Sequence, residues 1–365
     1  MSASTILFTG FPGFLGRELL PRVLERDPGA RAVCLVQGKF IAQARDAAGQ
    51  LERDRPALAG RIALSEGDIT RPDLGLGSDG ARLAKETREL YHLAAIYDLS
   101  VPRAFAELVN VEGTRHVLDF AERCGSLDRL QYVSTCYVSG RYAGIFGEED
   151  LEKGQRFNNH YEETKYGAEV LVRERMQKGL RATIYRPSIV VGDSKTGATQ
   201  KLDGPYYLLR WLLRQPRTAL LPIVGDPACF RFNVVPRDFV VDGIAYLSGR
   251  EDSLGRCYAL ADHAPPTCEE AVEIMARAAE RDVIRVPLSV GLAKTAIEKV
   301  PGVYALMQIP SSLVDYMAHP THYLNRATLD ALSPAGLAAP SFASYAPALA
   351  GFVREHLSMG SAAMA

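Results

Sequence analysis

The sequence is poor in cysteine and almost without net charge. None of its six cysteines forms a Cys-x-x-Cys pair, and Cys34 and Cys136 lie inside apolar runs. We interpret the six as reduced, mostly buried thiols rather than as disulfides or metal ligands. The 42 basic and 43 acidic residues give a formal charge of −1. A broad electrostatic surface for nucleic acid or for an anionic membrane is therefore not expected.

Long hydrophobic runs and clustered metal ligands are also missing from the sequence. No apolar run approaches the roughly 20 residues of a membrane span. The first apolar stretch, residues 4–8, is too short for a signal core and lacks a basic flank. His319 and His322 are the only close histidine pair, and Pro320 separates them without acids or thiols nearby. We expect a cytoplasmic protein with no metal site.

Short apolar runs and longer amphipathic stretches alternate through the first half of the chain. The runs predict strands at 5–9, 32–36, 61–65, 90–94, 130–134 and 182–185. Each is almost uninterrupted in its hydrophobicity, as strands buried on both faces are. Strand–helix alternation at this spacing predicts an α/β fold, a doubly wound parallel Rossmann sheet covered by helices on both sides.

The alternation loosens after residue 192, and the length of 365 residues suits two domains. We predict a first domain over 1–193, to which 230–250 returns. A smaller, mostly helical substrate-binding domain is expected over 194–229 and 251–365. Its leucine-rich and aromatic segment, 206–213, fits either the wall of a site for a lipid-like chain or an ordinary core helix.

A glycine-rich turn follows the first predicted strand and opens the first helix. It consists of Gly10, Phe11, Pro12, Gly13, Phe14, Leu15 and Gly16. Glycine at 10 permits a tight turn, glycine at 13 lets the backbone approach a diphosphate, and glycine at 16 allows close packing of helix on strand. Free N–H groups at the helix start would face the anion. This position in the chain predicts a dinucleotide-binding domain.

The end of the second strand bears on the choice of dinucleotide. Gln37 and Lys39 stand where an acid would bind the ribose hydroxyls of NAD, and no carboxylate follows until Asp46. Lys39 and Arg45 could neutralise a 2′-phosphate, or they are ordinary solvated charges. NADP(H) is therefore favoured, with NAD(H) as the alternative. Asp68 could meet the adenine, or it only caps the following turn.

A phenol, an ammonium and a hydroxyl form the candidate catalytic set. Tyr161 and Lys165 are four residues apart, on one face of a predicted helix. A neighbouring ammonium favours the phenolate, so we expect Lys165 to lower the pKa of Tyr161 and make it an acid/base. Thr135 follows the fifth strand, at the edge where parallel sheets bind ligands. The alternative is that Ser134 and Thr135 only satisfy backbone groups there.

Taken together, these pieces resemble the extended short-chain dehydrogenase/reductases over about residues 4–250. The matching motifs are Thr9-Gly10-x-x-Gly13-Phe14-Leu15-Gly16, Gly67-Asp68-Ile69, His92-Leu93-Ala94-Ala95, Asn110-Val111-x-Gly113-Thr114, Val133-Ser134-Thr135, Tyr161-x-x-x-Lys165 and Tyr185-Arg186-Pro187-Ser188. The resemblance implies Tyr161 as acid/base, Lys165 as its partner and ribose ligand, and Thr135 in the usual serine/threonine place. It also implies cofactor contacts from Asp68, Ile69, Leu93, Ala94 and Ala95, and a nicotinamide lined by Pro187, Ser188 and Ile189.

Within that family the chain is most similar to the fatty-acyl and thioester reductase branch. The motifs are Val133-Ser134-Thr135-x-Tyr137-Val138-Ser139-Gly140 and Asn233-Val-Val-Pro236-Arg-Asp238-Phe-Val240. The resemblance implies NADPH-dependent reduction of an acyl thioester, or of the derived aldehyde. The branch typically carries arginine where Gln37 stands. No carrier or adenylation domain is present in the 365 residues, so the acyl donor is expected as a separate carrier protein or a coenzyme A ester.

Other functions fit the same scaffold. A nucleotide-sugar epimerase or dehydratase and a hydroxysteroid-type dehydrogenase are the nearest alternatives, although an epimerase prefers an acid after the second strand. A regulator that senses NADP without chemistry is a third, against which the Tyr161–Lys165 pair argues. Helices around 101–123 and 160–178 often form a dimer face in this family, which is compatible with a homodimer; the alternative is a monomer in which these apolar helices are buried.

Overall fold

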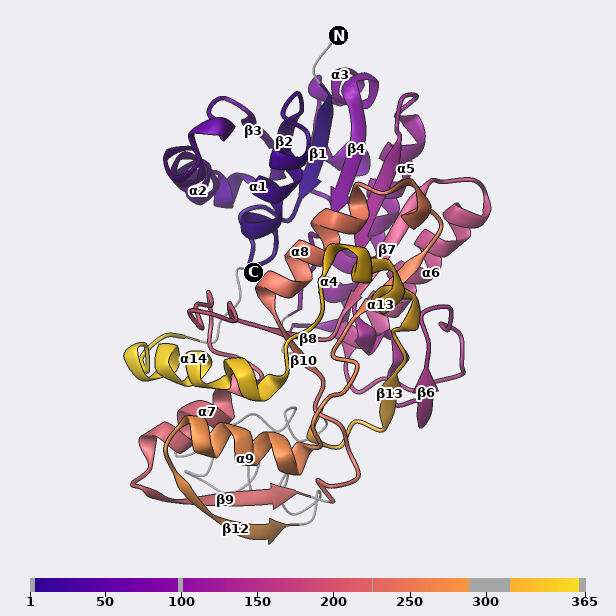
Figure 1. Ribbon diagram of the computed structural model, residues 1–365. Helices are drawn as coiled ribbons and strands as arrows, with labels where there is room; N and C mark the ends of the chain where they lie inside the picture. Colours follow the sequence, from indigo (N-terminus) through magenta and orange to yellow (C-terminus); the bar gives the residue numbers. More distant parts are fainter. Residues whose placement is uncertain (1–3, 98–100, 225, 289–315, 361–365) are drawn as a thin grey trace.

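A seven-stranded sheet, parallel throughout, forms the centre of the larger part of the molecule (Figure 1). The computed structural model describes residues 4–97, 101–224, 226–288 and 316–360. The strand order is β11-β7-β5-β4-β1-β2-β3. The strands are β1 Thr5–Thr9, β2 Arg31–Val36, β3 Ile62–Glu66, β4 Thr87–His92, β5 Arg129–Val133, β7 Ala182–Pro187 and β11 Cys257–Leu260.

Helices cover both faces of this sheet, as the apolar runs predict. In β1, Ile6 and Phe8 point to one face and Leu7 to the other, and all three are buried. The first face packs on α1 (Gly16–Arg26), α2 (Ile41–Asp54) and α8 (Arg237–Ser248). The second packs on α3 (Asp79–Glu86), α5 (Gly113–Arg123) and α6 (His160–Gln177). Strands buried on both faces lose the alternation of half-exposed ones, and the doubly wound parallel sheet is confirmed.

The seventh strand, β11, differs from the sequence prediction of six. It comes from the segment 251–365 that the sequence assigned to the second domain, and it extends the large sheet beside β7. Its four residues are all buried. A four-residue apolar run does not by itself distinguish a strand from a helix segment, and only pairing with β7 decides it.

A second hydrophobic core lies below the sheet in Figure 1. It joins α7 (Pro205–Arg214), α9 (Cys268–Ala278) and α14 (Phe342–Glu355) to a parallel pair, β9 (Thr218–Val224) and β12 (Asp282–Leu288). Leu208, Leu209 and Leu212 of α7 are buried in this core. Of the two interpretations of segment 206–213, the structure supports the core helix.

Short elements complete the described chain. Two further strand pairs are parallel, β8 (Ile189–Val191) with β10 (Val234–Pro236) and β6 (Gly144–Phe146) with β13 (Thr321–Tyr323). The remaining helices are α4 Arg103–Glu107, α13 Arg326–Leu332, a π-helical turn η4 Leu108–Glu112, and the 3₁₀ turns η1 Gly38–Phe40, η2 Pro56–Leu58, η3 Pro72–Gly75, η5 Cys136–Ser139, η6 Glu251–Ser253 and η7 Ser333–Ala335. In the described ranges no helix has both the length and the apolar character needed to cross a membrane.

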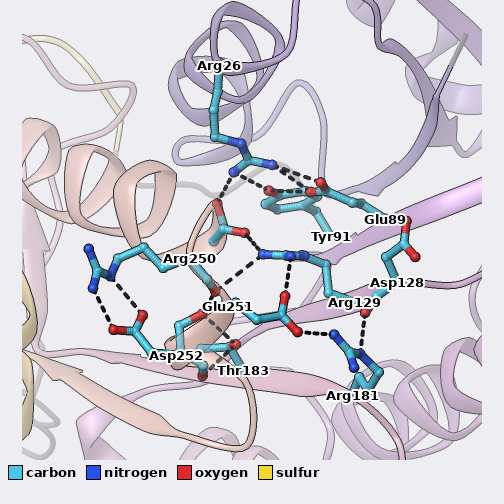
Figure 2. A network of polar contacts seen from close by, with 12 residues as sticks. Arg26, Glu89, Tyr91, Asp128, Arg129, Arg181, Thr183, Arg250, Glu251 and Asp252 are labelled. Carbon is cyan, nitrogen blue, oxygen red and sulfur yellow. Dashed lines mark hydrogen bonds and ion pairs between the residues drawn. The ribbon is translucent and has the colours of Figure 1, made fainter.

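A polar network ties the end of α8 to the large sheet (Figure 2). Arg26 of α1 pairs with Glu89 of β4 at 2.7 Å and donates to the Ser248 hydroxyl at 2.6 Å. Arg129 of β5 donates to the Ser248 carbonyl at 2.7 Å and pairs with Glu251 at 3.1 Å. These contacts satisfy the last carbonyl of α8 and hold the end of that helix against α1, β4 and β5.

Candidate active site

The glycine-rich turn is packed too tightly for any other residue at its three glycines. Gly10 has a φ of +88°, and a Cβ there would lie 2.8 Å from the Ala94 nitrogen. A Cβ on Gly13 would lie 2.8 Å from the Gly10 carbonyl oxygen, and one on Gly16 would approach the same oxygen even more closely. The three glycines therefore allow the backbone of the turn to pack closely at the start of α1. Free N–H groups at this helix start can bind an anion.

The residues after β4 lie directly against this turn. The Thr9 hydroxyl accepts hydrogen bonds from the backbone N–H groups of Leu93 and Ala94, each at 3.2 Å. The turn's Phe11 and Pro12 are buried, while Phe14, Leu15 and Ala95 are partly buried. The structure thus brings the predicted residues 10–16 and 93–95 to one place at the carboxyl edge of the sheet, where open α/β sheets bind ligands.

An acid from the neighbouring strand β3, which the sequence analysis missed, lies beside the loop after β2. The Glu66 carboxylate, at the end of β3, lies 2.6 Å from the position a Cβ on Gly38 would take. The search for an acid followed β2 alone, whereas the neighbouring strand supplies one. Lys39 is exposed, with its ammonium 4.8 Å from the Phe40 ring, and Arg45 is exposed on α2.

Asp68 serves the local turn, and Ile69 packs beneath it. The Asp68 carboxylate accepts hydrogen bonds from the Thr70 N–H at 2.9 Å and its hydroxyl at 2.8 Å. Burial opposes the charged form, but these bonds, one from Gln37 and the charge of Arg71 hold the pKa of Asp68 below its ordinary value. The capping role considered for Asp68 is therefore present. Ile69 is buried and would touch a Cβ on Gly113.

The hydroxyl groups of Thr135 and Tyr161 meet at the end of β5. Thr135 is 5% exposed and N-caps η5, its oxygen accepting from the Tyr137 N–H at 3.2 Å. Tyr161 stands on the first turn of α6, and its pKa is raised to about 12 by burial, against which a hydrogen bond with Thr135 acts. The backbone role considered for Thr135 is real, and it leaves the hydroxyl beside the phenol.

The contacts of Lys165 differ from those predicted for the Tyr161–Lys165 pair. Its ammonium donates to the Tyr132 hydroxyl at 3.0 Å and to the Val133 carbonyl at 2.8 Å. Burial lowers the pKa of Lys165 to about 7, although the Glu169 carboxylate acts to raise it. The expected lowering of the Tyr161 pKa is wrong for this structure, because burial disfavours the phenolate and the Lys165 ammonium is turned toward β5.

A network of buried ion pairs around Glu169 lies next to Lys165 and Thr135. Glu169, one turn after Lys165, has no exposed side-chain surface and pairs with Arg186 at 2.6 Å and Arg173 at 2.9 Å. It also accepts a hydrogen bond from Ser134 at 2.6 Å. Burial acts against its charge, but both arginines and Ser134 hold the pKa of Glu169 below its ordinary value. The four-residue spacing from Lys165 to Glu169 was a usable signal that the sequence analysis passed over.

A second set of polar contacts links the ends of β1 and β4 to η4, α5 and α6. His92 bridges the hydroxyls of Thr9 at 2.9 Å and Thr114 at 3.0 Å, and burial lowers its pKa to about 3. Asn110, in the π-helical turn, binds both backbone groups of Ile96 and donates to Thr164 on α6 at 3.0 Å. Through these bonds the Asn110 side chain joins the segment after β4 to α6 beside the site.

The segment after β7 offers a hydroxyl suited to a ligand. Pro187 and Ser188 are buried, Ile189 is partly buried, and the Pro187 carbonyl accepts a hydrogen bond from Thr135 at 3.4 Å. The Ser188 hydroxyl is buried and has no partner among the residues that the structure describes. The glycine-rich turn, which has no room for a Cβ, and this unpartnered hydroxyl both fit the binding of a dinucleotide cofactor. The described residues gather no three His, Cys, Asp or Glu side chains suited to a metal ion.

Comparisons with known proteins place this chain in a family. The family model described as "Male sterility protein" matches residues 8–244. A linear gramicidin synthase chain of Brevibacillus parabrevis is 30% identical over 258 residues, covering 68% of this chain and 5% of that protein. The L-2-aminoadipate reductase large subunit of Penicillium chrysogenum is 30% identical over 266 residues, covering 66% and 18% respectively.

Among solved structures, the terminal R domain from the myxalamid PKS-NRPS biosynthetic pathway superposes with a TM-score of 0.82 at 29% identity. That match covers 99% of this chain and 93% of the domain, whereas the chain spans only a small part of the curated relatives. The family match covers the glycine-rich turn, α6 and the sheet from the end of β1 to β7, but not β11. The chain therefore belongs to the NAD(P)-binding family described as male sterility protein, and it is an enzyme of the extended short-chain dehydrogenase/reductase type.

Proposed function

We propose that the chain reduces an acyl thioester, or the aldehyde derived from it, with NADPH. The carrying observation is the meeting of the Thr135 and Tyr161 hydroxyls beside Lys165, at the sheet edge that also holds the glycine-rich turn. The likeness to the R domain and to an aminoadipate reductase supports a thioester as substrate. A carrier protein or coenzyme A would present it.

The cofactor would be held along the turn and the three strand ends. Residues 10–16 would meet the diphosphate, Leu93, Ala94 and Ala95 would pack along it, and Ser188 would bond the nicotinamide end. When bound, the cofactor supplies the hydride. For its ribose, Gln37 and Lys39 favour a 2′-phosphate and Glu66 opposes one, so Glu66→Gln should tighten NADPH binding relative to NADH, whereas Lys39→Ala should weaken it.

The chain's own residues would manage the oxygen of the substrate carbonyl. The Thr135 hydroxyl donates a hydrogen bond to that oxygen, and Tyr161 transfers its proton to it as negative charge develops there. A phenol whose pKa is about 12 stays protonated at neutral pH and is ready to donate. From a thioester, collapse of the resulting hemithioacetal releases thiol and aldehyde, and a second round of reduction yields the alcohol.

The test follows the nicotinamide absorbance with an acyl-coenzyme A, an aldehyde, a sterol and a sugar nucleotide side by side. We expect oxidation of NADPH with the acyl thioester and the aldehyde. The sugar nucleotide is followed by analysis of its product, because an epimerase or dehydratase regenerates its cofactor and leaves the absorbance unchanged, and the sterol is offered with NADP+. Conversion confined to the sugar nucleotide would instead support an epimerase or dehydratase, and turnover confined to the sterol a hydroxysteroid-type dehydrogenase. Binding of NADPH without turnover of any substrate would favour a cofactor-sensing regulator.

A further inference from the structure

Four aromatic side chains form a cluster next to the loop that carries Thr135. The Tyr137 ring meets Tyr316 edge-on at 4.9 Å between centroids, and it meets His319 at the same distance. Tyr323 completes the cluster 5.9 Å from His319. Tyr316 and His319 come from the chain just before β13, more than 150 residues after the candidate catalytic residues in sequence.

This cluster borders the candidate catalytic hydroxyls. Tyr137 is two residues from Thr135, to whose hydroxyl its N–H is bonded at 3.2 Å. The Tyr316 hydroxyl accepts a hydrogen bond from Asn159, the N-cap of α6, at 2.9 Å. Burial is the main cause that raises the pKa of Tyr316, and the nearby Tyr161 adds to the rise. Any substrate carbonyl placed between Thr135 and Tyr161 would thus have these rings as its neighbours.

One nitrogen in the cluster is buried without a partner. His319 is 4% exposed, and its Nδ1 has no hydrogen-bond partner within the described part of the chain. Its other nitrogen, Nε2, lies 2.8 Å from the Tyr323 hydroxyl, which lies 3.3 Å from the Ser139 hydroxyl. A buried polar group without a partner destabilises the folded state, so it calls for an explanation, and a bound ligand would provide one.

One arrangement of protons is consistent with all of these contacts, and we adopt it. Ser139 donates to the Gly140 carbonyl at 3.4 Å, so its oxygen is free to accept from Tyr323. The Tyr323 oxygen then accepts from Nε2–H of His319, which leaves a lone pair on Nδ1. Burial lowers the pKa of His319 to about 3, so the ring stays neutral and Nδ1 stays an acceptor.

We propose that Nδ1 of His319 accepts a hydrogen bond from an amide N–H of the bound acyl thioester and so positions its carbonyl between Thr135 and Tyr161. The inference rests on the proposed function, because it names a contact of that substrate. An amide N–H is a neutral donor, which suits a neutral acceptor among aromatic rings better than a charged group does. Such an amide can lie on the thiol side of the thioester, as in a pantetheine arm, or on the acyl side.

Three small thioesters distinguish these sources. The hexanoyl thioester of N-acetylcysteamine has its amide on the thiol side, and the hexanoyl thioester of 2-mercaptoethyl acetate replaces that amide with an ester. The N-acetylalanyl thioester of 2-mercaptoethyl acetate has an amide on the acyl side only. For the wild-type chain with NADPH, we expect kcat/KM about 10-fold higher for one amide probe than for the amide-free probe.

Variants of His319 connect that preference to Nδ1. His319→Phe keeps a ring but removes the acceptor, so kcat/KM for the preferred amide probe should fall about 10-fold, mostly through KM, with the amide-free probe unchanged. His319→Asn places an oxygen near the Nδ1 position and should restore the preference. His322→Phe, at an exposed position on β13, is the matched control and should behave as wild type.

The outcomes separate the two hypotheses. If the wild type reduces neither the three thioesters nor hexanal, the proposed function fails and this inference fails with it. Reduction of hexanal but of none of the thioesters overturns the inference alone. Equal rates for amide and amide-free probes in the wild type overturn the inference alone, and that comparison needs no variant to fold. A His319→Phe variant that loses activity equally on every probe shows a structural role for the ring and likewise overturns it.

Discussion

Lys165 should make the stability of the folded chain depend on pH. Its ammonium is buried, and burial lowers its pKa from 10.5 to about 7. At about 1.4 kcal/mol per pKa unit, this difference amounts to about 5 kcal/mol of unfavourable free energy when the lysine is charged in both states. The unfolded chain holds the extra proton between the two pKa values, so folding stability rises with pH from about 7 to 10.5.

Replacing the lysine by methionine removes this titration and isolates its contribution. Lys165→Met should be more stable than wild type at pH 7, and its advantage should shrink by about 2–3 kcal/mol between pH 7 and pH 9. Urea unfolding at the two pH values measures the difference, in which groups common to both proteins cancel. Lys178→Met, at an exposed position after α6, is the control and should follow wild type at both pH values. An advantage of Lys165→Met that is the same at both pH values would refute the assignment of a strongly lowered pKa to this lysine.

Three further substitutions test other parts of the site. Tyr161→Phe should lower the reduction rate at least ~100-fold and leave NADPH affinity unchanged, as measured by turnover and by cofactor titration; unchanged turnover would remove the phenol from the mechanism. Gly13→Ala should weaken dinucleotide binding at least ~10-fold, because its Cβ would lie 2.8 Å from a backbone oxygen, whereas Gly125→Ala, whose Cβ meets nothing within 4 Å, should bind normally. Glu169→Gln should lower the free energy of unfolding by about 3–5 kcal/mol, measured in urea, since it leaves the guanidinium of Arg186 buried beside a neutral amide; a loss under 1 kcal/mol would contradict this account.

The sequence could predict the sheet because its strands follow local rules. Five of the six predicted strands overlap the observed ones to within a residue or two at each end, as Thr5–Thr9 shows without any shift. The strand predicted at 90–94 is instead Thr87–His92, because the chain leaves the strand after His92 and residues 93 and 94 pack against Gly10. The strand β11 escaped prediction because four apolar residues carry no periodicity of their own.

The residues of the candidate site likewise divide into those that the sequence predicted and those that it did not. The glycine-rich turn and the Tyr161–Lys165 pair were recognisable from their spacing together with their order along the chain, since each depends on residues within one turn or one helix. The acid at Glu66 and the lone pair on His319 were not predictable, because strands β2 and β3 meet only through pairing and β13 meets β6 only in the folded chain.

The sequence by itself determined the α/β class, the position of the glycine-rich turn and which side chains share a face of α6, because backbone sterics and helical period act over a few residues. The tertiary structure alone decided where the Lys165 ammonium points and how far burial moves the pKa values of Lys165 and Tyr161. Those quantities depend on groups brought together from β5, α6 and the chain after residue 315, and on the water that this packing excludes.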